Sequence, residues 1–375
     1  MKRLLVVALL FAALATALIT DTQTGSAKPV PRAPKTFFGV APQSPYSAKD
    51  LDYMRAGGIG SIRTLVSWTA IQPTEKGGYQ WEGLDLTVEE ASRKGMRLLP
   101  FIYGTPRWLN RDERRLPIDN GRQRSAWTKF LKAVVGRYGP GGEFWDEHSP
   151  ATVNYQSEAI RTPVPIRDWQ IWNEVNFFYF AFPVSVPRYA RLVNISGPAI
   201  KSVDPNANVM LSGLFGEPNP GGIKGMDAVD FLERLYRYPG IKSRFDSIAL
   251  HPYAVDAESL EEMIEGVHEV TEVARDRPGF YVTELGWGSQ NNFQEVAFEQ
   301  GPRGQVEQLR SSYRYMLENR GRLNLKGAYW FSWKDLKDSC NFCDSVGLFR
   351  EGPKFRAKPA WHTFVALSRG SARPR

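Results

Sequence analysis

The sequence predicts an α/β protein built around one closed parallel sheet. Strand-like apolar segments and helix-like amphipathic segments alternate eight times along the 375 residues, without a shift to a second type of composition. A hydrophobic content of 42% is enough for one large core, and about 250 residues suffice for an eight-stranded barrel. We therefore expect a single (β/α)₈ TIM barrel, one catalytic domain, over residues 36–370.

The strand-like segments are short apolar runs of the kind that parallel sheets bury on both faces. The second carries Arg63 within it and Trp68 at its end. The fourth and the seventh, DWQIWNEVN and YVTELGWGS, share one plan, in which a glutamate follows the apolar run. The expected strands are 36–42, 59–68, 96–103, 168–176, 208–215, 245–253, 281–289 and 325–333.

A segment with helical spacing of apolar residues follows each expected strand. The first helix stops at Gly57 and the second at Gly95, because glycine accepts the backbone conformation that ends a helix. The expected helices are 47–56, 81–94, 125–138, 187–203, 227–238, 259–275, 303–319 and 359–367. Two connections are long: we expect 139–167 to lie over the active face, and 334–351 to shape the outer part of the site.

Motifs of other folds and chemistries are missing. A doubly wound open sheet is the competing architecture, but no Gly-rich phosphate turn follows the first strand. The four histidines are scattered, and the sequence has no H-E-x-x-H, G-x-S-x-G or nucleic-acid-binding motif. We therefore expect no metal, no cofactor and no nucleic-acid partner.

The N-terminal segment 1–27 has the pattern of a secretory signal, with two basic residues before a long apolar run. The run is a little long and its small-residue cleavage sites compete, so an uncleaved N-terminal anchor is the alternative. Only in that case do we expect contact with a membrane. Residues 28–35, rich in proline, predict a flexible linker. A secreted or cell-envelope location follows from this pattern.

The formal net charge is +8, but lysine and arginine are interspersed with aspartate and glutamate along the chain. This distribution favours a solvated basic surface, with weak attraction to acidic glycans or cell envelopes as the second interpretation.

Cys340 and Cys343 are the only cysteines. In an exported protein such a pair favours a local disulfide that closes a loop. Neither a second cysteine pair nor a neighbouring histidine completes a metal site, and the context of a redox motif is missing.

Glu174 and Glu284 end the fourth and seventh expected strands. In one parallel barrel, both would open onto the face that carries the chemistry. A single glutamate after a strand is more often a solvated loop residue. Here Asn173 offers a donor and an acceptor for a sugar hydroxyl, and Trp172 and Trp287 bring aromatic surface beside the carboxylates. Retaining hydrolysis of a glycoside requires two such carboxyl groups about 5 to 5.5 Å apart.

Four motifs at strand ends resemble a known group of enzymes. In order along the chain they are Trp172-Asn173-Glu174, His251-Pro252-Tyr253, Thr283-Glu284 and the segment 330–333. This arrangement resembles clan A of the glycoside hydrolases, the 4/7 retaining superfamily. Within the clan it is most similar to the β-xylosidase and α-iduronidase-like family 39 and to the cellulase-like family 5. The resemblance covers the chain from about residue 36.

The resemblance implies a role for each matched residue. These are Glu174 as general acid/base, Glu284 as nucleophile, Asn173 as ligand of the sugar 2-hydroxyl, Arg63 as support for the nucleophile, and His251 and Tyr253 as neighbours that orient the pair. Arg63 and a tyrosine hydroxyl would keep Glu284 ionised, while apolar surroundings would raise the pKa of Glu174. Without the resemblance, Arg63 is interpreted as a structural ion pair and His251 as a core residue.

Tryptophans at strand ends are candidates for stacking on sugar rings. They are Trp68, Trp108, Trp330 and Trp333. Core packing is the alternative, because tryptophan is well buried on average. Alternation along the eighth strand is expected to point only one of Trp330 and Trp333 inward.

Taken together, the sequence predicts a metal-independent retaining glycoside hydrolase that cleaves O-glycosidic bonds of a poly- or oligosaccharide by double displacement. A non-catalytic carbohydrate-binding barrel is the alternative, and a transglycosylase would share the same residues. The resemblance spans xylosides, glucans, mannans, galactans and uronides, so it leaves the sugar open.

Overall fold

The computed structural model describes residues 30–152, 159–218, 225–292, 294–340 and 342–374. The chain divides after Pro31, and Arg32–Arg375 form one compact unit. The expected signal segment 1–27 lies outside the described residues. Among those described, no helix is both long and apolar enough to cross a bilayer.

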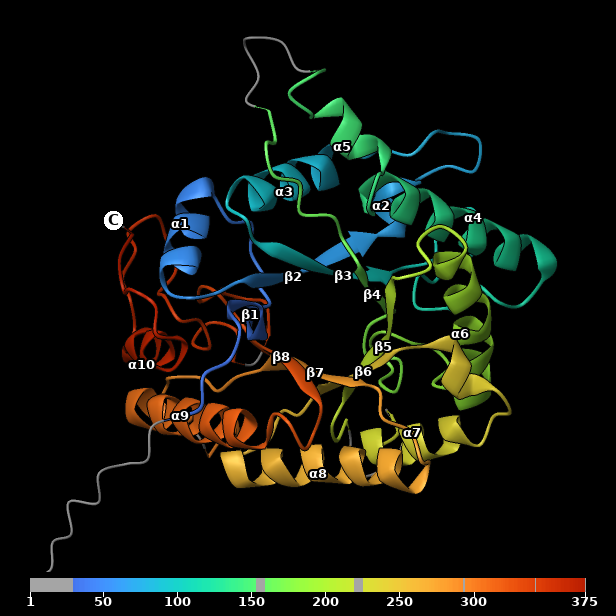
Figure 1. Ribbon diagram of the computed structural model, residues 1–375. Coiled ribbons are helices and arrows are strands. Elements are labelled where there is room, and N and C mark those ends of the chain that lie inside the picture. The colour runs from blue at the N-terminus through green and yellow to red at the C-terminus, as the bar shows by residue number, and fades with distance from the viewer. Residues whose placement is uncertain (1–29, 153–158, 219–224, 293, 341, 375) are drawn as a thin grey trace, which may run out of the picture. The chain divides into compact units, whose positions relative to one another are not determined.

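Eight parallel strands close into a barrel in sequence order, with β1 paired to both β2 and β8 (Figure 1). The strands are β1 (Phe38–Val40), β2 (Ser61–Ser67), β3 (Arg97–Tyr103), β4 (Asp168–Ile171), β5 (Asn208–Phe215), β6 (Ser247–His251), β7 (Gly279–Leu285) and β8 (Leu325–Trp330). Each expected strand is present, so the (β/α)₈ prediction is confirmed and the open-sheet alternative is wrong.

Helices surround the barrel on its outer side (Figure 1). The main ones are α1 (Ala48–Ala56), α3 (Glu82–Arg93), α4 (Gly121–Tyr138), α6 (Val186–Lys201), α7 (Ala228–Tyr236), α8 (Ala257–Val273), α9 (Gly301–Asn319) and α10 (Pro359–Ser368). Short pieces add α2 (Trp68–Ile71), α5 (Glu143–Glu147) and the 3₁₀ turns η1 (Lys35–Phe37) and η2 (Ile241–Arg244). Side-chain caps define several starts; Ser47, for example, forms a capping box with Asp50.

Side chains fill the barrel interior. Leu99, Met210, Ala249 and Tyr329 form a buried cluster contributed by four strands. Gly39 faces Tyr329 so closely that a Cβ atom there would lie 2.2 Å from the ring, so only glycine fits. Arg63 lies in the interior as well, with its guanidinium 4.0 Å from the centre of the Phe101 ring. The barrel is therefore a packed core whose polar groups belong to the site at its carboxyl end.

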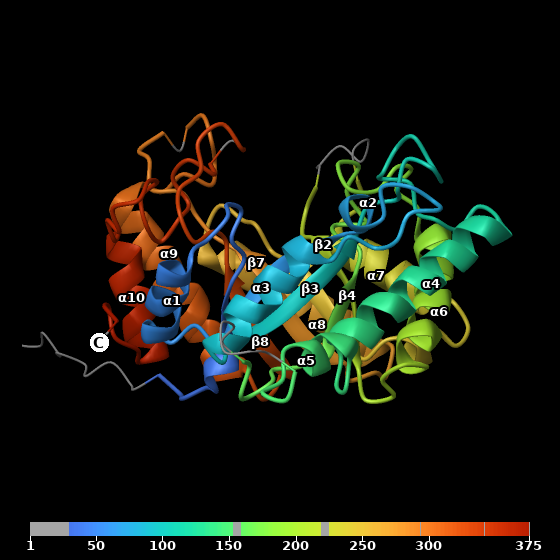
Figure 2. The ribbon, with the colours of Figure 1, turned by 90° about the horizontal axis from the view of Figure 1, so that it is seen from above.

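The two long connections lie at opposite ends of the barrel. α5 and its neighbours lie at the amino ends of the strands, away from the short helix α2 that follows β2 (Figure 2). The helices run back antiparallel to the strands, and the described parts of this helix-to-strand connection, residues 139–152 and 159–167, lie at this end. The expectation that it covers the active face is therefore wrong. The connection 334–351 follows β8 and does reach the carboxyl end.

Candidate active site

The end of β4 bends sharply and aims Glu174 at the barrel opening. Trp172 and Glu174 have positive φ angles of 74° and 36°, which are strained for residues with a side chain. Hydrogen bonds hold the bend: Trp172 N–H donates to Ile102 O (3.0 Å) and Glu174 N–H to Gly213 O (3.1 Å). The strand consequently ends at Ile171, earlier than expected from the sequence.

Glu284, near the end of β7, accepts hydrogen bonds from two strong donors. Arg63 Nη1 lies 2.5 Å from Oε1, and the Tyr253 hydroxyl donates to Oε2 at 2.8 Å. Arg63 is itself buried and is held in place by Gln170 Oε1 (2.9 Å from Nε) and Asn173 Oδ1 (2.6 Å from Nη2). The Asn173 oxygen is thus occupied, and its NH₂ group is left to donate to a ligand.

Glu174 has a different neighbour. His251 Nδ1 lies 2.7 Å from Glu174 Oε1, and His251 Nε2 lies 2.9 Å from Thr283 Oγ1. Gly213 permits this approach, because a Cβ atom there would lie 2.1 Å from His251 Nε2. Burial, and then the nearby Arg63 charge, lower the pKa of His251 well below its usual range, so the imidazole is neutral.

These surroundings place the proton of the pair on Glu174. Burial raises the pKa of Glu174 well above its usual range, and the charge of Glu284 raises it further. Burial also raises the pKa of Glu284, but Arg63 and the Tyr253 hydroxyl act against that rise. The Tyr253 pKa is itself raised by burial and by Glu284, so this hydroxyl stays protonated and donates. Glu174 is therefore a neutral acid when Glu284 is ionised.

The two carboxylates lie close together at the carboxyl end of the barrel. One oxygen of each and a ring nitrogen of His251 lie within 4.8 Å of one another. By distance alone, these three side chains could also ligate a cation. The buried Arg63 guanidinium already occupies Glu284 Oε1 and would repel a metal ion. We interpret the cluster as an acid and a base rather than as a metal centre.

Three of the four tryptophans proposed to stack on sugar are buried in the core. Trp68, Trp330 and Trp333 are 0%, 0% and 1% exposed. The Trp68 ring stacks on Phe130, at 5.3 Å between centroids. The indole of Trp330 donates to Val346 O (3.1 Å) and that of Trp333 to Asp50 Oδ1 (2.7 Å). The prediction that they stack on sugar is wrong: each is a core residue with a satisfied N–H group. Trp108 is half-buried, and its indole donates to Gln72 O.

Two buried phenylalanines pack against the tyrosine that donates to Glu284. Phe331 and Phe342 contact the Tyr253 ring edge-on, at 5.8 and 5.6 Å between centroids. A disulfide joins Cys340 to Cys343, as predicted, and closes the loop that carries Phe342. The disulfide loop therefore packs beside the residue that donates to Glu284.

One residue of the site, Gln170, was missed in the sequence, and Thr283 was named there only as part of a motif, without a role. Gln170 holds Arg63, and Thr283 is the partner of His251. Gln170 is a fully buried polar side chain on β4, and a polar residue within an apolar strand is the signal that would have found it.

Comparison with solved structures shows what this architecture is similar to. No protein-family model matches the sequence, and no curated protein is similar to it at a significant level. A family 39 glycoside hydrolase from Bacteroides cellulosilyticus WH2 superposes with a TM-score of 0.61 at 18% identity, covering 90% of this chain and 64% of that one. A monomeric β-xylosidase from Caulobacter crescentus CB15 superposes with a TM-score of 0.60 at 17% identity, covering 90% and 68%. The chain has the fold of these TIM-barrel glycoside hydrolases.

A third similar structure belongs to a different glycoside hydrolase family. A family 51 α-L-arabinofuranosidase from Bifidobacterium longum superposes with a TM-score of 0.60 at 12% identity, covering 92% of this chain and 75% of that one. The chain spans about two thirds of the length of the first two of these proteins. The sequence-based resemblance is thus confirmed for the fold.

Proposed function

We propose that the protein is a retaining glycoside hydrolase that acts by double displacement. The observation that carries the proposal is the pair of buried carboxyl groups, which have one oxygen each within 4.8 Å of the other and differ in their hydrogen-bond partners. This spacing suits retention, whereas inversion requires about 6.5 to 9.5 Å to admit a water molecule between the groups.

In the first step, ionised Glu284 attacks the anomeric carbon and forms an ester with the sugar. Neutral Glu174 donates its proton to the departing glycosidic oxygen. In the second step, Glu174, now a carboxylate, takes a proton from water. The resulting hydroxide attacks the anomeric carbon and releases Glu284. The free NH₂ group of Asn173 is available to the sugar 2-hydroxyl in both steps.

His251 supports the change of protonation on Glu174. When Glu174 is neutral, its O–H can donate to His251 Nδ1 while Nε2–H donates to Thr283 Oγ1. When Glu174 is ionised, Nδ1–H donates to the carboxylate and the Thr283 hydroxyl donates to Nε2. The contacts at 2.7 and 2.9 Å suit both tautomers, so the imidazole can follow the proton without moving.

The test is hydrolysis of a panel of 4-nitrophenyl glycosides by the purified protein, with the first-formed product anomer identified by ¹H NMR. We expect one glycoside to be cleaved with retention, and Glu284→Ala to be inactive. Glu299→Gln is the matched control, because Glu299 is a fully buried glutamate bonded to Ser345 outside the pair. Cleavage with inversion, or full activity of Glu284→Ala, would overturn the proposal.

If the protein binds a glycan but cleaves no member of the panel, the non-catalytic carbohydrate-binding alternative replaces the hydrolase proposal.

A further inference from the structure

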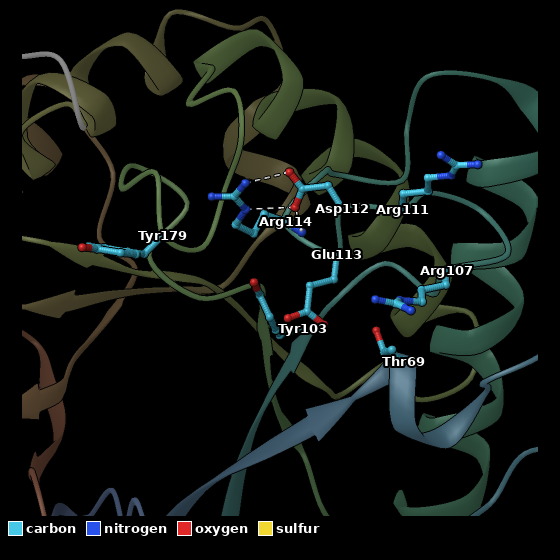
Figure 3. Close-up of a pocket in the computed structure, with 8 residues that line it drawn as sticks. All are labelled: Thr69, Tyr103, Arg107, Arg111, Asp112, Glu113, Arg114 and Tyr179. Carbon is cyan, nitrogen blue, oxygen red and sulfur yellow. Dashed lines mark hydrogen bonds and ion pairs between the residues drawn. The ribbon is translucent and has the colours of Figure 1, made fainter. Parts of the chain in front are cut away.

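A cavity of about 610 Å³ lies at the carboxyl ends of β2 and β3 (Figure 3). Its lining comes from the end of β3 and from the connections that follow β2, β3 and β4. The lining residues are Thr69, Tyr103, Arg107, Arg111, Asp112, Glu113, Arg114 and Tyr179. None of them takes part in the chemistry proposed above.

The three arginines of the cavity are not equivalent. Arg114 is neutralised by Asp112, with two hydrogen bonds of 2.9 Å between its guanidinium and the carboxylate. Arg107 and Arg111 are exposed, and within the described part of the chain neither has an ion-pair or hydrogen-bond partner. Arg107 points toward Glu113 and Thr69, whereas the Arg111 side chain points away from the other lining residues (Figure 3). The Arg107 guanidinium is thus available to a ligand inside the cavity, and that of Arg111 only to a ligand that extends past its rim.

The paired arginine fixes the shape of the cavity. Arg114 Nη1 donates to Phe178 O at 3.3 Å, and the Phe182 N–H donates to Arg114 O at 3.2 Å. The Arg114 guanidinium also lies 5.4 Å from the Phe182 ring. These contacts join the connection after β3 to the connection after β4, which carries Tyr179. The cavity is therefore held open before a ligand arrives, which lowers the cost of binding.

Aromatic rings connect the cavity to the catalytic pair. On one side, Tyr103 packs on Trp172 at 4.9 Å between centroids, two residues before Glu174. On the other side, neighbouring rings run from Tyr179 to Phe177 (5.0 Å), Phe215 (5.1 Å) and Tyr253 (5.6 Å). Tyr179 is 58% exposed, so its ring is open to a sugar face. These packed rings, most of them buried or half-buried, place the cavity close to the elements that carry the two carboxylates.

We propose that this cavity binds an acidic sugar residue of the substrate, one that carries a carboxylate or a sulfate group. Guanidinium groups recognise both anions through paired hydrogen bonds. The Glu113 carboxylate, which points into the cavity between Tyr103 and Arg107 (Figure 3), accepts hydrogen bonds from sugar hydroxyls. This inference rests on the proposed function in one respect: it assumes that the ligand is a glycan.

The cavity lining carries both positive and negative side chains, and this combination disfavours some classes of ligand. Asp112 and Glu113 lie on the same connection as the three arginines, so the net charge of the lining is small. A densely charged polyphosphate would be repelled by Glu113, whereas a sugar with one anionic group offers its charge to Arg107 and Arg111 and its hydroxyls to Glu113. Cavities that bind nucleic acid are uniformly basic by contrast.

The test measures binding to a Glu284→Gln protein, which cannot complete cleavage, by isothermal titration calorimetry at low ionic strength. The probes are three matched pairs. They are methylglucuronic-acid-substituted xylotriose against xylotetraose, tetragalacturonate against its methyl ester, and a sulfated carrageenan tetrasaccharide against its desulfated form. We expect one acidic member to bind at least about tenfold more tightly than its neutral partner, with affinity falling as salt is added. The pair that shows this preference distinguishes carboxylate from sulfate.

Variants then assign the preference to the cavity. Arg107→Gln should raise the Kd for the acidic glycan about tenfold and Arg111→Gln about threefold. Neither should change the Kd for the neutral partner. Arg191→Gln combined with Arg310→Gln removes the same charge from the exposed surfaces of α6 and α9 and should change the Kd less than twofold.

Three results would overturn the inference: no acidic member binds, neutral members bind as tightly, or acidic binding survives the Arg107 and Arg111 substitutions together. The inference and the proposed function fail separately. If acidic glycans bind through the arginines but the parent cleaves no glycoside, the cavity stands and the hydrolase proposal falls. If neutral glycosides are cleaved with retention and acidic glycans do not bind, the reverse holds.

Discussion

Glu174 and Glu284 are the same residue type, equally buried, at the ends of two strands of one barrel, but their surroundings are opposite. Glu284 accepts hydrogen bonds from a permanent cation, Arg63, and from the Tyr253 hydroxyl. Glu174 has only a neutral imidazole, His251, which can accept or donate a proton. The barrel supplies two identical groups, and their neighbours make one a nucleophile and the other an acid.

Removing the two carboxylates in turn should give the largest difference in kcat between variants. Glu284→Ala removes the attacking atom, and we expect kcat for any glycoside to fall by roughly 10⁵-fold or more. Glu174→Ala should lose about 10²- to 10⁴-fold on a glycoside with a poor leaving group, but much less on a dinitrophenyl glycoside, which departs without a proton. Steady-state kinetics with both leaving groups measure this difference.

Added azide tests the different roles of the two carboxylates in a second way. In Glu174→Ala, azide can replace the water that lacks a base, so the rate should recover and a glycosyl azide of retained configuration should form. Equal loss on both leaving groups, without recovery, would contradict the assignment of Glu174 as acid/base.

Arg63 is the residue on which the contrast depends. Arg63→Met leaves Glu284 buried without its cation, and we expect kcat/KM to fall by about 10²- to 10³-fold and the free energy of unfolding to fall by about 3 to 5 kcal/mol. Arg63→Lys keeps the charge but loses the planar fork that holds Gln170 and Asn173, so its effects should be intermediate. A wild-type rate in Arg63→Met would show that Glu284 does not need the cation.

The free energy of unfolding should respond more strongly to Glu174→Gln than to Glu284→Gln. The raised folded-state pKa of Glu174 means that the native protein retains a proton that the unfolded chain releases. The contribution of this group is present at low pH and is lost as pH rises through the folded-state pKa. Glu174→Gln should therefore be more stable than the parent at pH 8, by about 1 to 3 kcal/mol, and similar to it at pH 4.

Glu284→Gln also removes a carboxylate whose pKa is raised by burial, but it leaves the buried Arg63 guanidinium without its negative partner. Because these two effects oppose each other, this variant should gain less stability at pH 8 than Glu174→Gln does. Chemical denaturation at the two pH values measures both variants. A larger gain for Glu284→Gln than for Glu174→Gln would reverse the roles drawn from the structure.

The pH profile of kcat/KM should be a bell, with its acidic limb set by Glu284 and its basic limb by Glu174. Tyr253→Phe removes a hydrogen bond that lowers the pKa of Glu284, so the acidic limb should move upward by about one pH unit or less. The basic limb should stay in place. A shift confined to the basic limb would show that Tyr253 acts on the other carboxylate.

The smallest effect concerns the disulfide loop on the Glu284 side. Replacing Cys340 and Cys343 by serine releases the loop that places Phe342 against Tyr253. We expect about 2 kcal/mol less stability and a loss of kcat/KM within about tenfold. Phe342→Leu, which keeps the disulfide, is the control that separates the contact from the covalent link.

Much of the fold, and most residues of the candidate site, could be predicted from the sequence. The barrel is encoded locally, as apolar runs that alternate with amphipathic helices, so each expected strand and helix is present. The glutamates, Arg63, His251 and Tyr253 lie on strands or directly after them, and a closed barrel brings such positions together. The motif resemblance supplied the pairing that periodicity alone does not.

The errors have physical reasons. Trp330 and Trp333 flank the end of β8, where strand alternation stops and no longer predicts direction. The two indole N–H groups instead donate hydrogen bonds to Val346 O and to Asp50 Oδ1. The cavity was not predicted because its arginines become a site only when connections from three strands converge, and Tyr103 and Tyr179 are far apart in sequence.

The location of the proton is the central claim, and ¹³C NMR of protein labelled at the glutamate Cδ atoms tests it without any substrate. We predict one Cδ resonance that titrates at unusually high pH in the parent and is missing in Glu174→Gln. In Glu284→Gln this resonance should remain and should titrate at lower pH, because the neighbouring negative charge is gone. A high-pH resonance that is missing in Glu284→Gln and present in Glu174→Gln would place the proton on the other carboxylate and contradict the account.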